Sequence, residues 1–194
     1  QGTLYGSSST SGNIRIITKK PDVNAIDYGF DVDYGSITDG SHDRSLEAYM
    51  NIPIGDKSAI RISAYDLKDG GWIDNELASK TFTNSGVTIN NSEHVEDDYN
   101  SLTKDGFRIR FASEIGNQNL DLSILEQSSS FGGSWETDED VGARANSRFS
   151  EEHFDDEFSQ ISLSLSGDIS DNLEYVFTSS MFDRDVDYTY DYTE

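Results

Sequence analysis

The chain has 194 residues, enough for one domain with a core, and its Asp and Glu residues outnumber Lys and Arg by 37 to 14. The net charge of −23 disfavours nucleic acid as a partner, because binding phosphate needs cationic groups that release counterions. The absence of cysteine excludes a disulfide framework and a thiolate metal site, and no apolar run is long enough to predict a membrane-spanning helix.

The chain begins with a stretch rich in glycine and serine, QGTLYGSSSTSGNIRIITKKP, which leads into a short apolar segment. Two glycines bracket the Thr-Leu-Tyr triplet and are suited to the positive φ of a tight turn. The isoleucines of the IRII segment predict a buried strand, which Pro21 ends. The alternative interpretation is a flexible linker before an ordinary strand.

Alternation of apolar and polar residues, the period of a β-strand, recurs in seven segments. They are residues 26–34, 46–54, 60–65, 107–112, 120–124, 161–166 and 173–181. Each segment places apolar side chains on one face and polar side chains on the other. No segment has a convincing helical period. The sequence therefore predicts an all-β chain.

Tight and longer connections alternate between these segments. Turn-forming residues at 55–57, 117–118 and 168–172 predict hairpins. If residues 117–118 form a two-residue loop, Phe111 faces Ile124. The remaining connections, at 36–41, 70–103 and 131–156, include two long loops. The tight turns are therefore expected at one rim of the sheet and the other connections at the opposite rim.

Two architectures fit seven two-faced strands. A β-sandwich would bury the apolar faces against each other, whereas a transmembrane β-barrel would turn them to lipid. Residues 26–34 and 46–54 alternate for nine residues each, near the about 9–11 that cross a bilayer and beyond the usual 5–6 of soluble strands. Long loops at one rim and short turns at the other are also typical of outer-membrane barrels. These lengths favour an antiparallel transmembrane β-barrel, with the sandwich as the alternative.

The first 21 residues resemble the end of the plug domain of TonB-dependent outer-membrane receptors. In that family a Pro-Gln-Gly-Thr-Leu-Tyr-Gly turn leads through small residues into a Gly-x-Ile-x-Ile-Ile-Thr-Lys strand, and the first barrel strand follows. The matching positions in this chain are Gly2, Thr3, Leu4, Tyr5, Gly6, Gly12, Ile14, Ile16, Ile17 and Thr18.

The resemblance implies two domains. Residues 1–21 correspond to the C-terminal end of the plug, and residues 22–194 to the first seven barrel strands with outer loops at 36–41, 70–103 and 131–156. Receptors of this type close with about 22 strands. The chain is therefore expected to be a fragment of such a receptor.

The resemblance also implies active import of a nutrient across the bacterial outer membrane, driven by the TonB energy-transducing complex. The family's commonest cargo is an iron–siderophore complex, and carbohydrate or cobalamin stay open. Outer-membrane lipid and lipopolysaccharide would surround the protein, and no cofactor is implied. Enzymatic motifs such as Gly-x-Ser-x-Gly and His-Glu-x-x-His are missing, so no enzyme is predicted. A secreted β-sandwich adhesin or carbohydrate-binding module is the alternative function.

Five charged residues on the polar faces are candidates for the lumen of a barrel. They are Arg61, Arg108, Arg110, Asp31 and Glu47. In a lumen they would hold water, contact the plug or meet cargo, and cross-strand charge pairing is the alternative interpretation.

Four residues of the two long loops are candidates for contact with cargo: Trp72, His94, Tyr99 and Trp135. For the tryptophans, anchoring at the membrane interface is the favoured interpretation, and stacking on a sugar or an aromatic cargo is the alternative. All three histidines fall in predicted outer loops beside carboxylates, a ligand set that suits zinc or iron. Ordinary polar loop residues are the favoured interpretation, and no metal site is predicted.

Overall fold

The computed structural model describes residues 16–193, which form eleven strands and, within that range, no helix. Seven strands build one antiparallel sheet in the order β1-β2-β3-β7-β8-β10-β11. Their bounds are β1 Asp27–Ser36, β2 His42–Ile54, β3 Ser58–Asp69, β7 Leu102–Ile115, β8 Gln118–Phe131, β10 His153–Ser170 and β11 Leu173–Thr189. The predicted all-β fold with a large antiparallel sheet is therefore confirmed.

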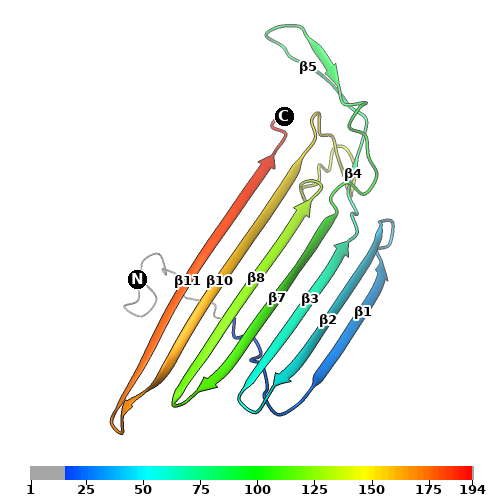
Figure 1. Cartoon of the computed structure of the whole chain (residues 1–194). Coiled ribbons are helices and arrows are strands. Elements are labelled where there is room, and N and C mark those ends of the chain that lie inside the picture. Colours follow the sequence, from blue (N-terminus) through cyan, green and yellow to red (C-terminus); the bar gives the residue numbers. More distant parts are fainter. Residues whose placement is uncertain (1–15, 194) are drawn as a thin grey trace.

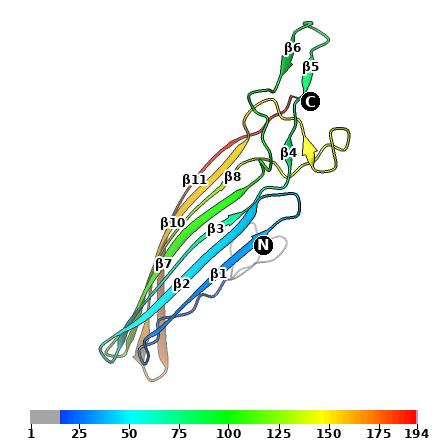
Figure 2. The ribbon, with the colours of Figure 1, turned by 90° about the vertical axis from the view of Figure 1, so that its right-hand side faces the viewer.

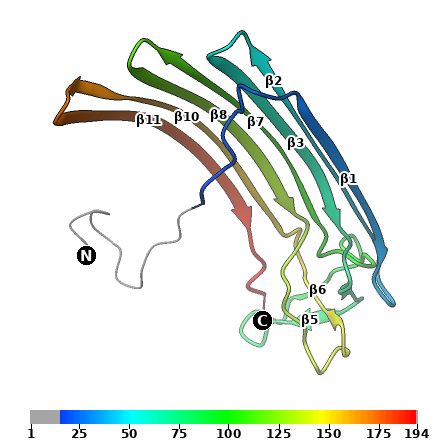
Figure 3. The same cartoon turned by 90° about the horizontal axis from the view of Figure 1, so that it is seen from below.

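The seven strands form a single curved layer (Figure 1). Figure 3 shows the layer as an arch, with the segment before β1 on its concave side. The sheet is open: β1 and β11 lie at its two edges, and each pairs with only one strand among the described residues. Within residues 16–193, no helix has the length and apolar character to cross a membrane.

Three tight hairpins connect the strands at one rim. The turns are residues 55–57, 116–117 and 171–172. The middle turn differs from the prediction by one residue: it consists of Gly116 and Asn117, and Phe111 pairs with Leu122 rather than with Ile124. Gly116 has a φ of 64°, which glycine adopts without steric cost, and glycine in first position is typical of a favoured two-residue hairpin.

The longer connections lie at the opposite rim, as the alternation of loop lengths predicts (Figure 1). Two of them are residues 70–101 and 132–152. They are slightly shorter than the predicted loops 70–103 and 131–156, because β7 and β10 begin earlier than predicted and β8 includes Phe131. They contain four short strands that were not predicted. β4 (Asp74–Asn75) pairs in parallel with β9 (Ala145–Asn146), and β5 (Ser79–Thr81) with β6 (Thr88–Asn90) forms an arm that projects from the loops (Figure 2).

Paired residues show that the sheet has one apolar and one polar face, since directly opposed residues share a face. One row, called here the apolar row, crosses all seven strands: Tyr28, Met50, Ile62, Ile109, Ile124, Ile161 and Met181. The adjacent row on the other face is Asp27, Asn51, Arg61, Arg110, Ser123, Ser162 and Ser180. Arg110 donates from Nη1 to the carbonyl oxygen of Thr18 at 3.0 Å. The polar face is therefore the concave one, along which the segment before β1 runs (Figure 3).

The apolar residues of the convex face form a band that crosses the paired rows obliquely. On β1 the run 26–34 is centred on Phe30, two residues from Tyr28 toward the loops. On β11 the run 173–181 is centred on Phe177, four residues from Met181 toward the turns. From β1 to β11 the centre of the apolar run therefore moves by six residues over six steps, an average of about one residue per step. The runs on β2, β3 and β7 stay centred on the apolar row, and the shift occurs between β1 and β2, between β7 and β8, and between β10 and β11.

The tight turns follow the same slant. The last paired residues before the three turns are Ile54, Ile115 and Ser170, which lie four, six and nine residues beyond the apolar row on their strands. In Figure 1 the turns accordingly lie near one line, and the strands cross that line at an angle. The apolar band and the turn rim are thus inclined to the strands in the same direction.

The sheet contributes almost nothing to a hydrophobic core. Of the buried apolar residues, only Ala59 lies in the seven strands, whereas Ile73, Tyr99 and Ala145 lie in the loop region. The large side chains of the band are open to the surroundings, and Phe30 is 77 % exposed. A β-sandwich would cover this face with a second large sheet, and residues 16–193 form none.

Candidate functional site

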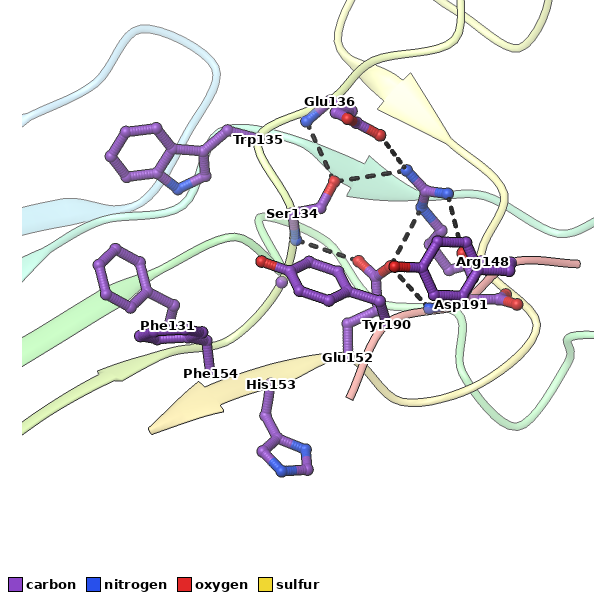
Figure 4. Close-up of a pocket in the computed structure, with 12 residues that line it drawn as sticks. Phe131, Ser134, Trp135, Glu136, Arg148, Glu152, His153, Phe154, Tyr190 and Asp191 are labelled. Atoms are coloured by element: carbon purple, nitrogen blue, oxygen red, sulfur yellow. Dashed lines mark hydrogen bonds and ion pairs between the residues drawn. The ribbon is translucent and has the colours of Figure 1, made fainter. Parts of the chain in front are cut away.

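A cavity of about 750 Å³ opens at the loop rim of the sheet, between the loop 132–152, the start of β10 and the segment after β11 (Figure 4). Its lining residues are Phe131, Gly133, Ser134, Trp135, Glu136, Arg148, Glu152, His153, Phe154, Tyr190, Asp191 and Tyr192. Phe131 and Phe154 belong to the concave face, because they share its parity on β8 and β10. The cavity therefore continues the concave face of the sheet.

Six aromatic side chains, five of which line this cavity, follow one another as ring neighbours and are called here the aromatic row. Its centre consists of Phe131, Phe154 and Tyr188, which are paired across β8, β10 and β11. Their ring centroids are 5.8 and 6.2 Å apart. At one end Trp135 lies 6.0 Å from Phe131. At the other end the centroid distances are 5.8 Å from Tyr188 to Tyr190 and 6.5 Å from Tyr190 to Tyr192.

The row follows from strand geometry. Cross-strand neighbours on one face stand about 5 Å apart at Cβ, which brings rings on adjacent strands into contact. Spacing by two along the chain also keeps side chains on one face, and the three tyrosines at positions 188, 190 and 192 have this spacing. Aromatic pairs at these distances stabilise each other by about 0.5–1.5 kcal/mol beyond the area they bury.

Buried charged residues hold together the chain segments that carry the aromatic row. Glu152, whose side chain is 2 % exposed, accepts hydrogen bonds from the backbone N–H of Ser134 at 3.0 Å and of Asp191 at 3.1 Å. Its Oε1 also lies 3.5 Å from Nε of Arg148. Burial alone would lower the pKa of Arg148, but the charge of Glu152, with contacts to Tyr99 and Glu136, outweighs it and raises that pKa. The folded loops thus favour the charged form of Arg148, and the contacts of Glu152 with Ser134, Arg148 and Asp191 fix three chain segments around the cavity.

Asp191 holds the segment after β11 in a similar way. It is 6 % exposed and accepts backbone hydrogen bonds from Phe149, Ser150 and Thr193. Burial alone would raise the pKa of Asp191, but these hydrogen bonds outweigh it and hold that pKa below its usual value. The charged form of Asp191 is thus the form that the folded loops stabilise.

This shift predicts that the cavity wall loosens in acid. A carboxylate whose pKa is lowered by folding stabilises the fold above its unfolded pKa, about 3.9, and this contribution is lost as the pH falls through the folded pKa. We expect hydrogen exchange at Phe149 and Ser150, corrected for its intrinsic pH dependence, to accelerate below about pH 4. In the Asp191→Asn variant, the amides of Phe149 and Ser150 should exchange rapidly already at pH 7, and their corrected exchange rates should change less as the pH falls. Equal protection at pH 6 and pH 3 in the unmodified protein would contradict this role.

Asparagine side chains connect the two long loops into one unit. Asn75 donates to the carbonyl oxygens of His94 and Arg148 and accepts from the N–H of Arg148. Asn91 donates to the carbonyls of Glu76 and Arg148, and its own Oδ1 accepts from the N–H of Ala78. Both asparagines are buried. The loop 70–101 is therefore a support for Arg148 and, through it, for the cavity.

The four loop residues predicted to contact cargo lie in different surroundings. Trp135 is 61 % exposed and lines the cavity at the end of the aromatic row. Tyr99 is 7 % exposed and lies inside the loop unit, where its hydroxyl donates to the carbonyl of Ser134 at 3.1 Å. Trp72 and His94 are half-buried in the loop 70–101 and do not line the cavity. Of the four, the structure brings only Trp135 to the cavity surface.

The five candidates for a lumen share the concave face, as the pairing shows for Arg61, Arg108, Arg110, Asp31 and Glu47. Two of them make close contacts. Arg110 forms two hydrogen bonds with Asp121, at 2.8 and 2.6 Å. The guanidinium of Arg61 lies 4.1 Å from the ring centroid of Tyr49 and 3.6 Å from Asp27. The predicted cross-strand charge pairing is therefore present, and Arg110 also contacts the segment before β1 through Thr18.

Most of the residues that carry the plug resemblance, from Gly2 to Ile14, lie outside the described residues. Ile16 and Ile17 are described, and they differ from the expectation of a buried strand: they form no strand and are 83 % and 77 % exposed. A strand needs a neighbouring chain to pair with its backbone, and no described residue pairs with this segment. Instead, Arg110 holds it at Thr18.

His94 and His153 line one hollow in the loop region, and His42 does not line it. His42 stacks on Tyr34 with centroids 5.5 Å apart, and His153 lies 3.8 Å from Asp187. In the part of the chain that the structure describes, no three His, Asp or Glu side chains come together as metal ligands.

Sequence reasoning missed most of the cavity. It did not single out Phe131, Phe154, Tyr188, Tyr190, Tyr192, Arg148, Glu152 or Asp191. One signal was present: on β8, β10 and β11, large aromatic residues occupy polar-face positions toward the loop end of each strand. Comparisons of the chain with protein-family models, with curated proteins and with solved structures give no match, so the cavity has to be interpreted from its own chemistry.

Proposed function

We propose that this chain is the first part of a transmembrane β-barrel in the bacterial outer membrane, preceded by the end of a plug domain, and that the complete barrel imports a nutrient. The observation that carries the proposal is the common slant of the apolar band and the tight turns. A soluble sheet has no reason to align its apolar residues with its turns along a line inclined to the strands. A membrane aligns both sets of residues, because the apolar side chains have to lie within the hydrocarbon layer and the polar turns have to lie in the water beside it.

The size of the slant supports a barrel. An average shift of one residue per strand, at a rise of about 3.3 Å and a strand spacing of about 4.8 Å, inclines the strands by about 35° to the normal of the band. Strands in closed barrels are inclined by about 35–45°. The longest apolar runs have nine residues on one strand, such as 26–34 and 46–54. Nine residues span about 30 Å, or about 24 Å once inclined, close to the roughly 25 Å apolar band of outer-membrane barrels.

The two faces support the same assignment. The convex face carries exposed apolar side chains that a lipid bilayer would cover. The concave face carries ion pairs and the segment 16–22, which runs along it as the end of a plug would run inside a barrel. Further strands paired to β1 and β11 would close the sheet and remove both open edges.

The resemblance of residues 1–21 to the plug of TonB-dependent receptors completes the proposal. In such a receptor, cargo binds at the outer loops and plug, and the TonB complex supplies energy that displaces the plug. Partners are then the TonB complex, outer-membrane lipid with lipopolysaccharide, and a small-molecule cargo. By resemblance the leading cargo is an iron–siderophore complex, with carbohydrate and cobalamin as the other candidates. No enzymatic activity is proposed.

The proposal is tested by expressing the full-length protein in a Gram-negative host with and without a functional TonB gene. We expect the protein in the outer-membrane fraction, with an electrophoretic mobility that changes on heating in detergent, and a nutrient uptake that needs TonB. A protein found in the soluble fraction, or an uptake that is equal in both strains, contradicts the proposal.

A further inference from the structure

The charged groups around the cavity are already engaged with one another. Glu152 is held by Arg148 and by two backbone N–H groups, and Asp191 by three. Glu136 lies 3.1 Å from Arg148, and His153 lies 3.8 Å from Asp187. Figure 4 shows the carboxylates of Glu136 and Glu152 turned toward the guanidinium of Arg148. An anionic ligand would therefore have to displace Glu152 from Arg148, which leaves an unpaired buried charge behind and is costly.

The groups that remain open to a ligand are flat rings with polar edges. Trp135, Tyr190 and Tyr192 line the cavity and are 61 %, 44 % and 86 % exposed. Among the described residues, neither the hydroxyls of Tyr188, Tyr190 and Tyr192 nor the indole N–H of Trp135 has a hydrogen-bond partner. The free surface thus offers apolar faces for stacking and neutral donors and acceptors beside them.

The wider surroundings disfavour anions. Residues 131–157 and 183–193 contain thirteen Asp or Glu residues and three Arg residues. A region lined by one sign of charge repels ligands of the same sign on approach. An anionic ligand therefore meets both an unfavourable field and a cavity without a free cationic group.

We propose that the aromatic row is a binding platform for an uncharged linear oligosaccharide. A pyranose ring has a flat C–H face that stacks on an aromatic ring, and a rim of hydroxyls that exchange hydrogen bonds with phenols and an indole N–H. The rings of the row follow one another at centroid spacings of 5.8–6.5 Å, and its exposed members Trp135, Tyr190 and Tyr192 provide such platforms at the two ends of the row. The inference rests on the proposed function in one respect: the bound oligosaccharide is taken to be the transported cargo.

The experiment uses the full-length protein in detergent and four probes. Two are neutral glucose hexasaccharides, α-1,4- and β-1,4-linked, one is a galacturonate hexamer, and one is benzyltrimethylammonium. Binding is followed by calorimetry and by the fluorescence of Trp135, obtained as the difference between the emission of the unmodified protein and that of the Trp135→Phe variant. We expect at least one neutral hexasaccharide to bind and to shift the emission of Trp135, with the anion and the cation at least about tenfold weaker.

Two single substitutions test the row itself. Trp135→Ala and Tyr192→Ala remove exposed rings and should each weaken hexasaccharide binding about three- to tenfold, as expected for one stacked ring. Phe82→Ala, on the β5–β6 arm away from the cavity, is the matched control and should leave binding unchanged. The inference is overturned if neither neutral hexasaccharide binds, if the anion or the cation binds as tightly, or if all three substitutions have the same effect.

The two proposals fail separately. If no hexasaccharide binds but another nutrient is taken up with the help of TonB, the inference is wrong and the proposed function stands. If a hexasaccharide binds through the aromatic row but uptake is independent of TonB, the proposed function is wrong and the binding site stands.

Discussion

Arginine in place of Leu163 is expected to prevent most of the full-length protein from reaching its folded form in the outer membrane. Leu163 lies on the convex face near the middle of the apolar band, paired with Leu122 and Ser179. A lipid-facing arginine near the midplane costs about 2–4 kcal/mol. The expected result is a heat-modifiable, surface-accessible fraction at least about tenfold below that of the unmodified protein, measured by labelling of intact cells.

The adjacent residue provides a matched control. Ser162 lies on the same strand but on the concave face, in the row that contains Arg110 and small neighbours at Ser123 and Ser180. Ser162→Arg therefore adds the same side chain where a lumen would hydrate it, and near-normal levels are expected. Equal losses for the two variants would show that the faces are not divided between lipid and water, and a loss for Ser162→Arg alone would invert the assignment.

The strands could be predicted from the sequence because their signal is local. An alternation of period two fixes which residues share a face, and a tight turn fixes the register of the two strands that it joins. The error at the middle hairpin shows the limit of this reasoning. Turn residues surround positions 116–118, and the positive φ of Gly116 selects a turn one residue earlier than predicted. The pairing moved by two residues, so the faces stayed correct.

The loop unit could not be predicted, because its contacts join segments that are far apart in the chain. β4 pairs with β9 across about seventy residues, and each has only two residues. Asn75 reaches the backbone of Arg148 through a side-chain contact that leaves no periodic pattern in the sequence. A loop rich in Asn and Asp suggests a solvated surface, and only the fold shows that several of these side chains are buried.

The aromatic row illustrates the same limit at the cavity. Phe131 was predicted at the start of a loop, whereas it is the last residue of β8. Phe154 and Tyr188 lie on two further strands and meet Phe131 only through the register. Because β8, β10 and β11 are each longer than their alternating segments, the face that carries the row extends beyond the apolar band into the loop region. Strand length, more than strand position, was the missing information.

Removal of residues 74–100 is expected to abolish cargo binding while the sheet persists. Loop closure depends only logarithmically on length, by about 0.6 kcal/mol for each doubling, so β3 and β7 should still pair when a glycine-containing turn replaces this segment. The deletion removes Asn75, Asn91 and Tyr99, which contact Arg148, Asn146 and Ser134. Each buried polar group left without its partner costs about 1–3 kcal/mol, so the wall that positions the aromatic row should lose its order.

A smaller deletion separates loss of this support from loss of loop surface. Replacing residues 82–87 by Asn-Gly shortens only the tip of the β5–β6 arm, beyond the last paired residues Thr81 and Thr88. We expect this variant to keep its cargo affinity and uptake, and the 74–100 deletion to lose both at an equal surface level and with unchanged heat stability in detergent. If uptake survives the larger deletion, the loop 70–101 does not support the binding site. If the tip deletion alone abolishes uptake, the arm itself meets the cargo, and the cavity behind it is not the first point of contact.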